Sequence, residues 1–133
     1  MNFDFNEDQR RLQQEVKRFF SDKSPTDLTR KIMDGAELNL DLWKGLGKLG
    51  ALGIAIPENY GGAGLGHLEL CLIAEEAGRS LAPVPLLGSI YLAAELILAA
   101  GTEAQKAIWL PKIASGEFIA TAILDSNQQK LNT

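Results

Sequence analysis

The sequence predicts an all-α fold, a helical bundle of about six helices with one short strand at its C-terminal end. Apolar residues recur at helical spacing along most of the chain, and capping sequences stand where these periodic segments begin. Only the segment from 118 to 124 has the apolar, β-branched composition of a strand. Of the 133 residues, 46% are hydrophobic, which is enough for the core of one domain.

Two helices are expected at the N-terminal end. Asn6 is a typical cap for the first, because Gln9 follows three residues later and can complete a capping box. Val16 and Phe20 then lie on one apolar face. A shorter helix is expected to begin at Pro25, since proline is favoured in the first turn.

A third helix and a glycine-rich loop come next. Leu42, Leu46 and Leu49 repeat at helical spacing, and the glycines among them indicate close packing. The stretch IPENYGG at 56–62 is a shaped loop, because proline fixes its own φ and paired glycines tolerate positive φ. Tyr60 is expected to pack over this turn.

The middle of the chain predicts a helix from His67 to about Arg79. Leu72 and Ile73 belong to its buried face, whereas Glu75 and Glu76 are expected to form a solvated rim. Adjacent helical residues point about 100° apart, so these two carboxylates are not expected to act on one atom together.

Two prolines at 83 and 85 mark a break before a long helix from about Leu86 to Ala99. This helix is apolar nearly all round and should therefore be central. Residues 102–105 read as a capping box for one more helix, which Pro111 and the following Ser115-Gly116 are expected to end. The strand at 118–124 has no hairpin partner in the sequence, so a sheet is expected to begin there.

Charge and composition argue against several classes of protein. The formal net charge is -4 with the basic residues scattered, so no nucleic-acid partner is expected. The longest apolar stretch, around 90–100, contains Glu95 and is too short to span a membrane. With a single cysteine, Cys71, no intrachain disulfide is possible, and we expect a cytoplasmic protein.

No residue of the chain is predicted to be catalytic or to bind a metal. His67 is the only histidine and stands at a helix start, where a surface role is expected. Cys71 neighbours leucines on an apolar face and is interpreted as a small buried hydrophobe. The glycine run at 62–66 has neither the spacing nor the context of a phosphate-binding loop.

Two long stretches nevertheless resemble a known family. They are LWKGLGKLGALGIAIPENYGGAGLGHLELCLIAEEAGRS at 42–80 and AAGTEAQKAIWLPKIASGEFIATAIL at 99–124. With the acidic opening helix, they resemble the N-terminal helical domain of the acyl-CoA dehydrogenases over residues 3 to 124. The resemblance implies such a domain at 1–117, while 118–133 would begin the middle β-domain or be a non-native tail.

The resemblance also implies a function for the parent protein. Members of this family oxidise an acyl-CoA to the 2-enoyl-CoA with FAD as cofactor, and electron-transfer flavoprotein is the expected electron acceptor. The catalytic base comes from the C-terminal domain, so this chain alone is not expected to hold FAD or to be active. A homo- or hetero-oligomer is expected for the full-length form.

Within this domain, the resemblance assigns the wall of the acyl pocket to the helices around 68–80 and 84–98. By position, the implied substrate-binding residues are Val84, Leu87, Gly88 and Leu92. Gly88 either makes room for a long, branched or ring-bearing acyl group or permits close helix packing.

Flavin contacts are implied at Leu124 and Asp125, although the Asp-Ser-Asn at 125–127 departs from the family's TEP.AGSD pattern. The resemblance leaves open an acyl-CoA oxidase or a flavin monooxygenase with the same domain. A non-catalytic helical module that pairs with other subunits is the alternative from another class.

Overall fold

The computed structural model describes residues 4–123, which form helices and connecting turns. The α-helices are α1 (Glu7–Lys23), α2 (Thr26–Met33), α3 (Leu40–Lys48), α4 (His67–Arg79), α5 (Glu95–Ala100) and α6 (Glu103–Ala114). Two 3-10 helices, η1 (Ala51–Gly53) and η2 (Glu58–Tyr60), lie in the glycine-rich loop, and a π-helix, η3 (Leu87–Ala94), continues directly into α5. The predicted all-α fold is confirmed.

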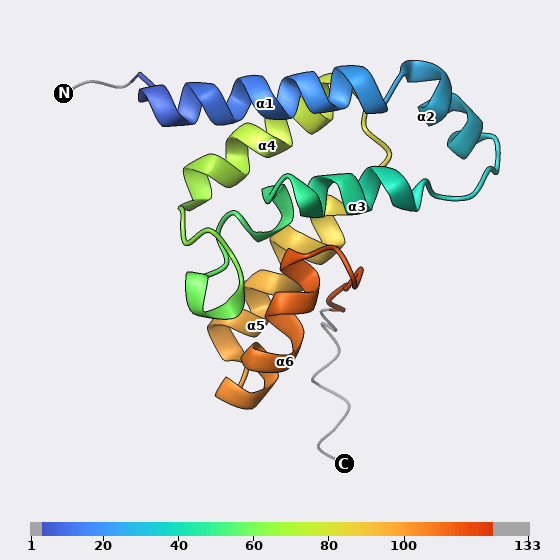
Figure 1. Ribbon diagram of the computed structural model, residues 1–133. Coiled ribbons are helices and arrows are strands. Elements are labelled where there is room, and N and C mark those ends of the chain that lie inside the picture. The colour runs from blue at the N-terminus through green and yellow to red at the C-terminus, as the bar shows by residue number, and fades with distance from the viewer. Residues whose placement is uncertain (1–3, 124–133) are drawn as a thin grey trace, which may run out of the picture.

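The helices pack in two groups. Helix α1 lies along one edge of the molecule with α4 packed beside it, and α5 and α6 form the opposite end (Figure 1). Helix α6 also contacts η1, η2 and η3, so the glycine-rich loop is held against it. Among residues 4–123, no helix combines the length and apolar character needed to cross a membrane.

One core joins the two groups. Its largest fully buried side chains come from α1, α3, η1, the loop that follows η1, α4 and α6, and are Val16, Phe20, Trp43, Leu46, Leu52, Ile56, Ile73, Leu110 and Ile113. Burial of an aliphatic or aromatic side chain of this size stabilises the fold by about 1.5–3 kcal/mol. The predicted apolar stripes of the first, third and fourth helices therefore meet in a single core.

Both capping boxes that the sequence predicts are formed. The Gln9 amide N–H donates to Asn6 Oδ1 at 2.8 Å, and the Asn6 N–H donates to Gln9 Oε1 at 3.0 Å. At the start of α6, Gln105 N–H donates to Thr102 Oγ1 at 3.2 Å and Thr102 N–H donates to Gln105 Oε1 at 2.8 Å. These bonds satisfy amide donors that a helix start otherwise leaves without partners.

The end of α6 agrees with the prediction in part, since the helix ends directly before Ser115-Gly116, but Pro111 has no part in ending it. Pro111 does not stop the helix, which continues to Ala114. A proline inside a helix costs about 3 kcal/mol because it lacks an N–H and crowds the preceding turn. Here Leu110, Ile113 and Ala114 are all buried, so core packing on both sides of the proline offsets that cost.

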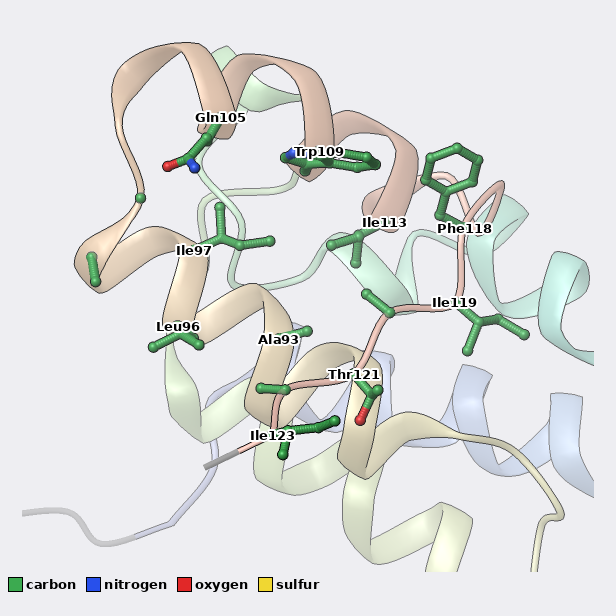
Figure 2. Close-up of a pocket in the computed structure, with 14 residues that line it drawn as sticks. Ala93, Leu96, Ile97, Gln105, Trp109, Ile113, Phe118, Ile119, Thr121 and Ile123 are labelled. Carbon is green, nitrogen blue, oxygen red and sulfur yellow. The ribbon is translucent and has the colours of Figure 1, made fainter. Parts of the chain in front are cut away.

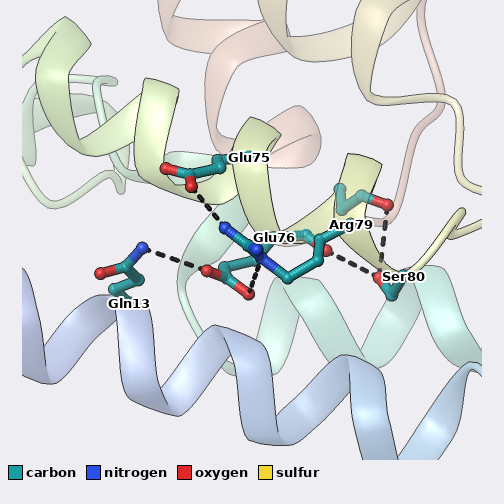
Figure 3. A network of polar contacts seen from close by, with 6 residues as sticks. Gln13, Glu75, Glu76, Arg79 and Ser80 are labelled. Atoms are coloured by element: carbon teal, nitrogen blue, oxygen red, sulfur yellow. Dashed lines mark hydrogen bonds and ion pairs between the residues drawn. The ribbon is translucent and has the colours of Figure 1, made fainter.

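The predicted solvated rim on α4 is also wrong for one of its two carboxylates. Glu75 is exposed and pairs with Arg79 at 2.5 Å, but the Glu76 residue is only 3% exposed. Gln13 Nε2 of α1 donates to Glu76 Oε1 at 3.1 Å, and Arg79 Nε lies 3.6 Å from Glu76 Oε2 (Figure 3). Helix α1 covers Glu76 and supplies the hydrogen bond that a buried carboxylate requires.

The expected C-terminal strand is not formed over its described part. Residues 118–123 have no regular secondary structure, because a strand needs a hydrogen-bonded neighbour and the described part of the chain offers none. The Ala120 N–H instead donates to Ser89 Oγ at 3.2 Å. Exposure still alternates along the segment, with Ile119, Thr121 and Ile123 turned to solvent. The last predicted strand residue, 124, lies outside the described residues.

Candidate functional site

An apolar groove lies between the C-terminal half of α4 and the start of η3. We call it the α4–η3 groove, and its volume is about 420 Å³. A volume in this range is ordinary for a small-molecule site. Its lining contains no charged side chain and consists of Ala74, Ala77, Gly78, Leu81, Ala82, Val84, Leu86, Leu87 and Tyr91.

A tight connection brings these two helices together. Ala82 N–H donates to Ala77 O at 2.9 Å, which folds the chain back immediately after α4. Leu81 has φ of 50°, a left-handed conformation that costs a leucine energy, and its carbonyl accepts from Thr29 Oγ1 at 2.9 Å. The chain thus turns before the two prolines, and Leu81, Ala82 and Val84 of this connection line one end of the groove.

The predicted pocket residues do not lie on one helical face, because Val84 precedes the helix and Leu87, Gly88 and Leu92 belong to the π-helix η3. Hydrogen bonds in a π-helix run from residue i to i+5, so residues four apart no longer stack as they do in an α-helix. Val84 and Leu87 line the α4–η3 groove, and Leu92 is an exposed residue that lines neither this groove nor the larger one described below. A Cβ on Gly88 would lie 3.2 Å from Thr121 Oγ1, outside the groove.

Tyr91 closes one side of the groove without offering it a free polar group. Its hydroxyl donates to the Leu70 carbonyl at 2.7 Å. Burial, and to a lesser extent the neighbouring Cys71, raises the pKa of Tyr91 to about 12, so its ring is neutral at physiological pH. Cys71 itself is exposed, and its prediction as a buried hydrophobe is wrong.

A larger groove of about 720 Å³ lies at the other end of the molecule. Helices α5 and α6 form two of its walls and the segment 118–123 forms the third (Figure 2). Its side chains are mainly apolar, with Trp109 and Phe118 in ring contact at 5.8 Å between centroids. This α5–α6 groove borders the segment that lacks a strand partner, and none of the four predicted substrate-binding residues lines it.

The polar contacts near these grooves are structural. His67 Nε2 lies 3.1 Å from Glu95 Oε2 in an exposed pair that joins α4 to α5. Tyr60 donates to Glu103 Oε2 at 2.5 Å, a bond that raises the Tyr60 pKa, lowers the Glu103 pKa and fastens the glycine-rich loop to α6. Within residues 4–123, no group of three or more His, Cys, Asp or Glu side chains is placed to hold a metal ion.

Of the nine residues that line the groove, the sequence predicted only Val84 and Leu87, and Gly78 is one of those it did not predict. Gly78 lines the groove from α4, but in the sequence it stood only as part of the EE.GR motif. A glycine inside a strongly periodic helical segment was the available signal. The predicted flavin contacts Leu124 and Asp125 lie outside the described residues.

Together, the fold and the grooves define a class: an all-helical domain with mainly apolar surface grooves. The family described as acyl-CoA dehydrogenase, N-terminal domain, matches residues 6–117. The chain therefore belongs to the acyl-CoA dehydrogenase family, as its N-terminal domain.

Relatives of known activity agree with this assignment. The chain is 39% identical over 126 residues to mitochondrial isovaleryl-CoA dehydrogenase of Pongo abelii, a match that covers 92% of this chain and 30% of that protein. It is 45% identical over 85 residues to (2S)-methylsuccinyl-CoA dehydrogenase of Cereibacter sphaeroides, covering 63% of this chain and 16% of that protein. The chain thus spans less than a third of the length of either relative.

Solved structures show the same fold. A variant of a steroid ACAD (acyl-CoA dehydrogenase) is similar, with a TM-score of 0.78 and 37% identity, over 86% of this chain and 32% of that chain. Acyl-CoA dehydrogenase complexed with FAD from Bacillus anthracis has a TM-score of 0.73 and 28% identity, over 88% of this chain and 20% of that chain.

Proposed function

We propose that this chain is the N-terminal, acyl-pocket-forming part of an FAD-dependent acyl-CoA dehydrogenase that oxidises an acyl-CoA to the 2-enoyl-CoA. The observation that carries the proposal is the α4–η3 groove, an uncharged apolar cleft on a domain of this family. Apolar burial holds an acyl tail with about 0.8 kcal/mol per CH₂, so such a cleft can select a tail by its size.

Val84 and Leu87 are proposed as direct contacts of the acyl tail, since both line the groove. Leu92, one turn further along, would contact substrate only where another part of the protein covers its exposed side chain. Gly88 is proposed to act differently. Its lack of a side chain lets the 118–123 segment approach η3, as the 3.2 Å distance from a Cβ to Thr121 Oγ1 indicates.

FAD itself does not fit the residues described. Both grooves are lined mainly by apolar side chains, whereas a flavin carries polar ring atoms and phosphates that need hydrogen-bond donors. We therefore propose that the flavin and the catalytic base are held outside residues 4–123, and Leu124 and Asp125 remain proposed flavin contacts.

The electron acceptor and the assembly are proposed from the family alone. Electron-transfer flavoprotein would take the electrons, and the whole protein would be a homo- or hetero-oligomer. Exposed apolar side chains at Trp109, Ile119 and Ile123 provide surface that further domains or subunits would cover.

The experiment uses the protein encoded by the complete reading frame that contains residues 1–133. After gel filtration, its flavin absorbance is measured, and an acyl-CoA such as butyryl-CoA or isovaleryl-CoA is added without oxygen. Bound FAD and loss of the oxidised flavin absorbance on adding acyl-CoA are expected.

The choice of acceptor then separates the alternatives. Rapid turnover with an artificial dye but not with oxygen is expected of a dehydrogenase, whereas hydrogen peroxide formation would indicate an oxidase. A protein that carries no flavin and does not react with any acyl-CoA would contradict the proposal and favour a non-catalytic interaction module.

A further inference from the structure

Gly78 has no structural reason to be a glycine. It lies in α4 with a helical backbone, where a glycine costs up to about 1 kcal/mol relative to alanine. A Cβ built on it would meet no atom within 4 Å. By contrast, a Cβ on Gly47 would lie 2.2 Å from Ser115 O, and one on Gly62 would lie 1.9 Å from Ile56 O. Close packing therefore explains those two glycines but not Gly78.

The missing side chain of Gly78 faces the α4–η3 groove. Ala74 stands one helical turn before it, and Ala77 lines the groove between them, so the α4 wall carries no side chain longer than a methyl group. The opposite wall carries the large side chains Leu87 and Tyr91. The absence of long side chains on the α4 wall therefore sets the width of the groove.

We propose that Gly78, together with Ala74, sets the width of this groove for an uncharged acyl tail that is branched or carries a ring. The inference rests on the proposed function and goes beyond it by naming the substrate class and the residues that select it. It assigns to α4 a selectivity that the sequence analysis gave as one of two alternative roles for Gly88.

The lining supports each part of this description. No charged side chain lines the groove and the Tyr91 hydroxyl is already bonded to Leu70 O, so a charged or hydroxylated tail would lose hydration without gaining a partner. A straight chain would leave an unfilled strip along the α4 wall, where no side chain is longer than a methyl group, and would forfeit the dispersion contacts there. A branched or cyclic tail fills that strip.

The test compares two substrates in the protein from the complete reading frame. They are 3-cyclohexylpropanoyl-CoA, whose ring would lie in the groove, and butyryl-CoA, whose tail is too short to need its width. The variants are Gly78→Leu and Ala74→Leu. Gln14→Leu adds the same side chain at an exposed position of α1 outside the groove and serves as control.

The measured quantity is kcat/KM for the cyclic substrate divided by kcat/KM for butyryl-CoA. We expect Gly78→Leu and Ala74→Leu to lower this ratio by about tenfold or more, since one misplaced methylene in an apolar pocket is worth roughly 10–200-fold. Gln14→Leu should leave the ratio at the wild-type value. Because Gly78→Leu adds bulk, Gly78→Ala is included as a milder variant, with a smaller decrease expected.

The outcomes separate this inference from the proposed function. If the wild-type protein oxidises acyl-CoA but the ratio does not change in Gly78→Leu, Gly78→Ala or Ala74→Leu, the inference is wrong and the proposed function stands. An equal loss for both substrates at an unchanged melting temperature would also overturn it. If wild-type protein oxidises butyryl-CoA but not the cyclic substrate, the inference is wrong; if it reacts with no acyl-CoA, the proposed function fails and the inference fails with it.

Discussion

At the scale of single residues, the glycines of this chain fall into groups with different physical roles. Gly50 and Gly61 have φ near +80°, a backbone conformation that favours glycine. Gly62 is needed because the chain folds tightly around it. Gly78 is free of both constraints.

The first prediction concerns Gly62. In Gly62→Ala, the new Cβ would lie 1.9 Å from Ile56 O and 2.6 Å from Gly53 O, and both carbonyls belong to the loop's own hydrogen-bonded backbone. The loop must therefore open, and we expect the free energy of unfolding to fall by about 2–3 kcal/mol or more. Urea unfolding of this chain followed by circular dichroism measures the change.

Gly78→Ala is the matched control for this prediction, because it adds the same methyl group where no atom lies within 4 Å. It should stabilise α4 by up to about 1 kcal/mol through helix propensity. Equal destabilisation by the two substitutions would mean that both glycines are required by packing, which would also remove Gly78 from the specificity argument.

At the scale of elements, α1 and α4 are joined by polar bonds along one side of an apolar contact. Gln9 Nε2 donates to Glu69 Oε1 at 2.8 Å, and Gln13 Nε2 donates to the buried Glu76. The bond from Gln9 is the main cause that lowers the Glu69 pKa. Two glutamines one turn apart on α1 thus fix its position against α4, the helix that forms a wall of the groove.

The second prediction compares the two adjacent carboxylates on α4. Glu76→Ala should lower the free energy of unfolding by about 1–3 kcal/mol, because it removes the acceptor of a part-buried bond from Gln13 and the buried partner of Arg79. Glu75→Ala removes an exposed partner of the same Arg79 and should cost at most about 1 kcal/mol. Urea unfolding of both variants checks this difference, and an equal cost would show that the contacts of Glu76 with Gln13 and Arg79 contribute no more than the exposed pair of Glu75.

The same helices show what the sequence could and could not predict. Both capping boxes and the apolar stripes were predictable because they depend on residues within a few positions of one another. The burial of Glu76 was not, because Gln13 lies 63 positions away and only the packing of α1 on α4 brings the two together. The exposure of Cys71 has the same origin, since periodicity alone does not say which face a neighbour covers.

The π-helix η3 limits how far the candidate site could be predicted from the sequence. Residues four apart share a face in an α-helix, but Val84 lies before the helix and Gly88 and Leu92 lie in a π-helix, so the three do not share one face. In η3, Gly88 is turned towards Thr121. No composition signal distinguishes a π-helix from an α-helix. The sequence could therefore predict which helices border the candidate site, but not the direction in which each of their residues faces.

At the scale of the whole molecule, large apolar side chains are exposed along both grooves. Leu87 is 70% exposed at the α4–η3 groove, and Ile123 is 89% exposed beside the α5–α6 groove. The segment 118–123 keeps the alternating exposure of a strand without a neighbouring strand among the described residues. Each groove therefore has walls from this domain and an open side that other parts of a larger protein would close.

The last prediction follows from these open sides. Residues 1–133 alone should neither retain FAD nor oxidise acyl-CoA, because a groove with one open side cannot bury most of a ligand's surface, as small-molecule sites do. The chain is mixed with excess FAD and passed through gel filtration, and the flavin absorbance that co-elutes is compared with that of the protein from the complete reading frame. Circular dichroism of the same sample shows whether the helices are formed. A folded chain that elutes with stoichiometric flavin would contradict the prediction and place the cofactor site inside this domain.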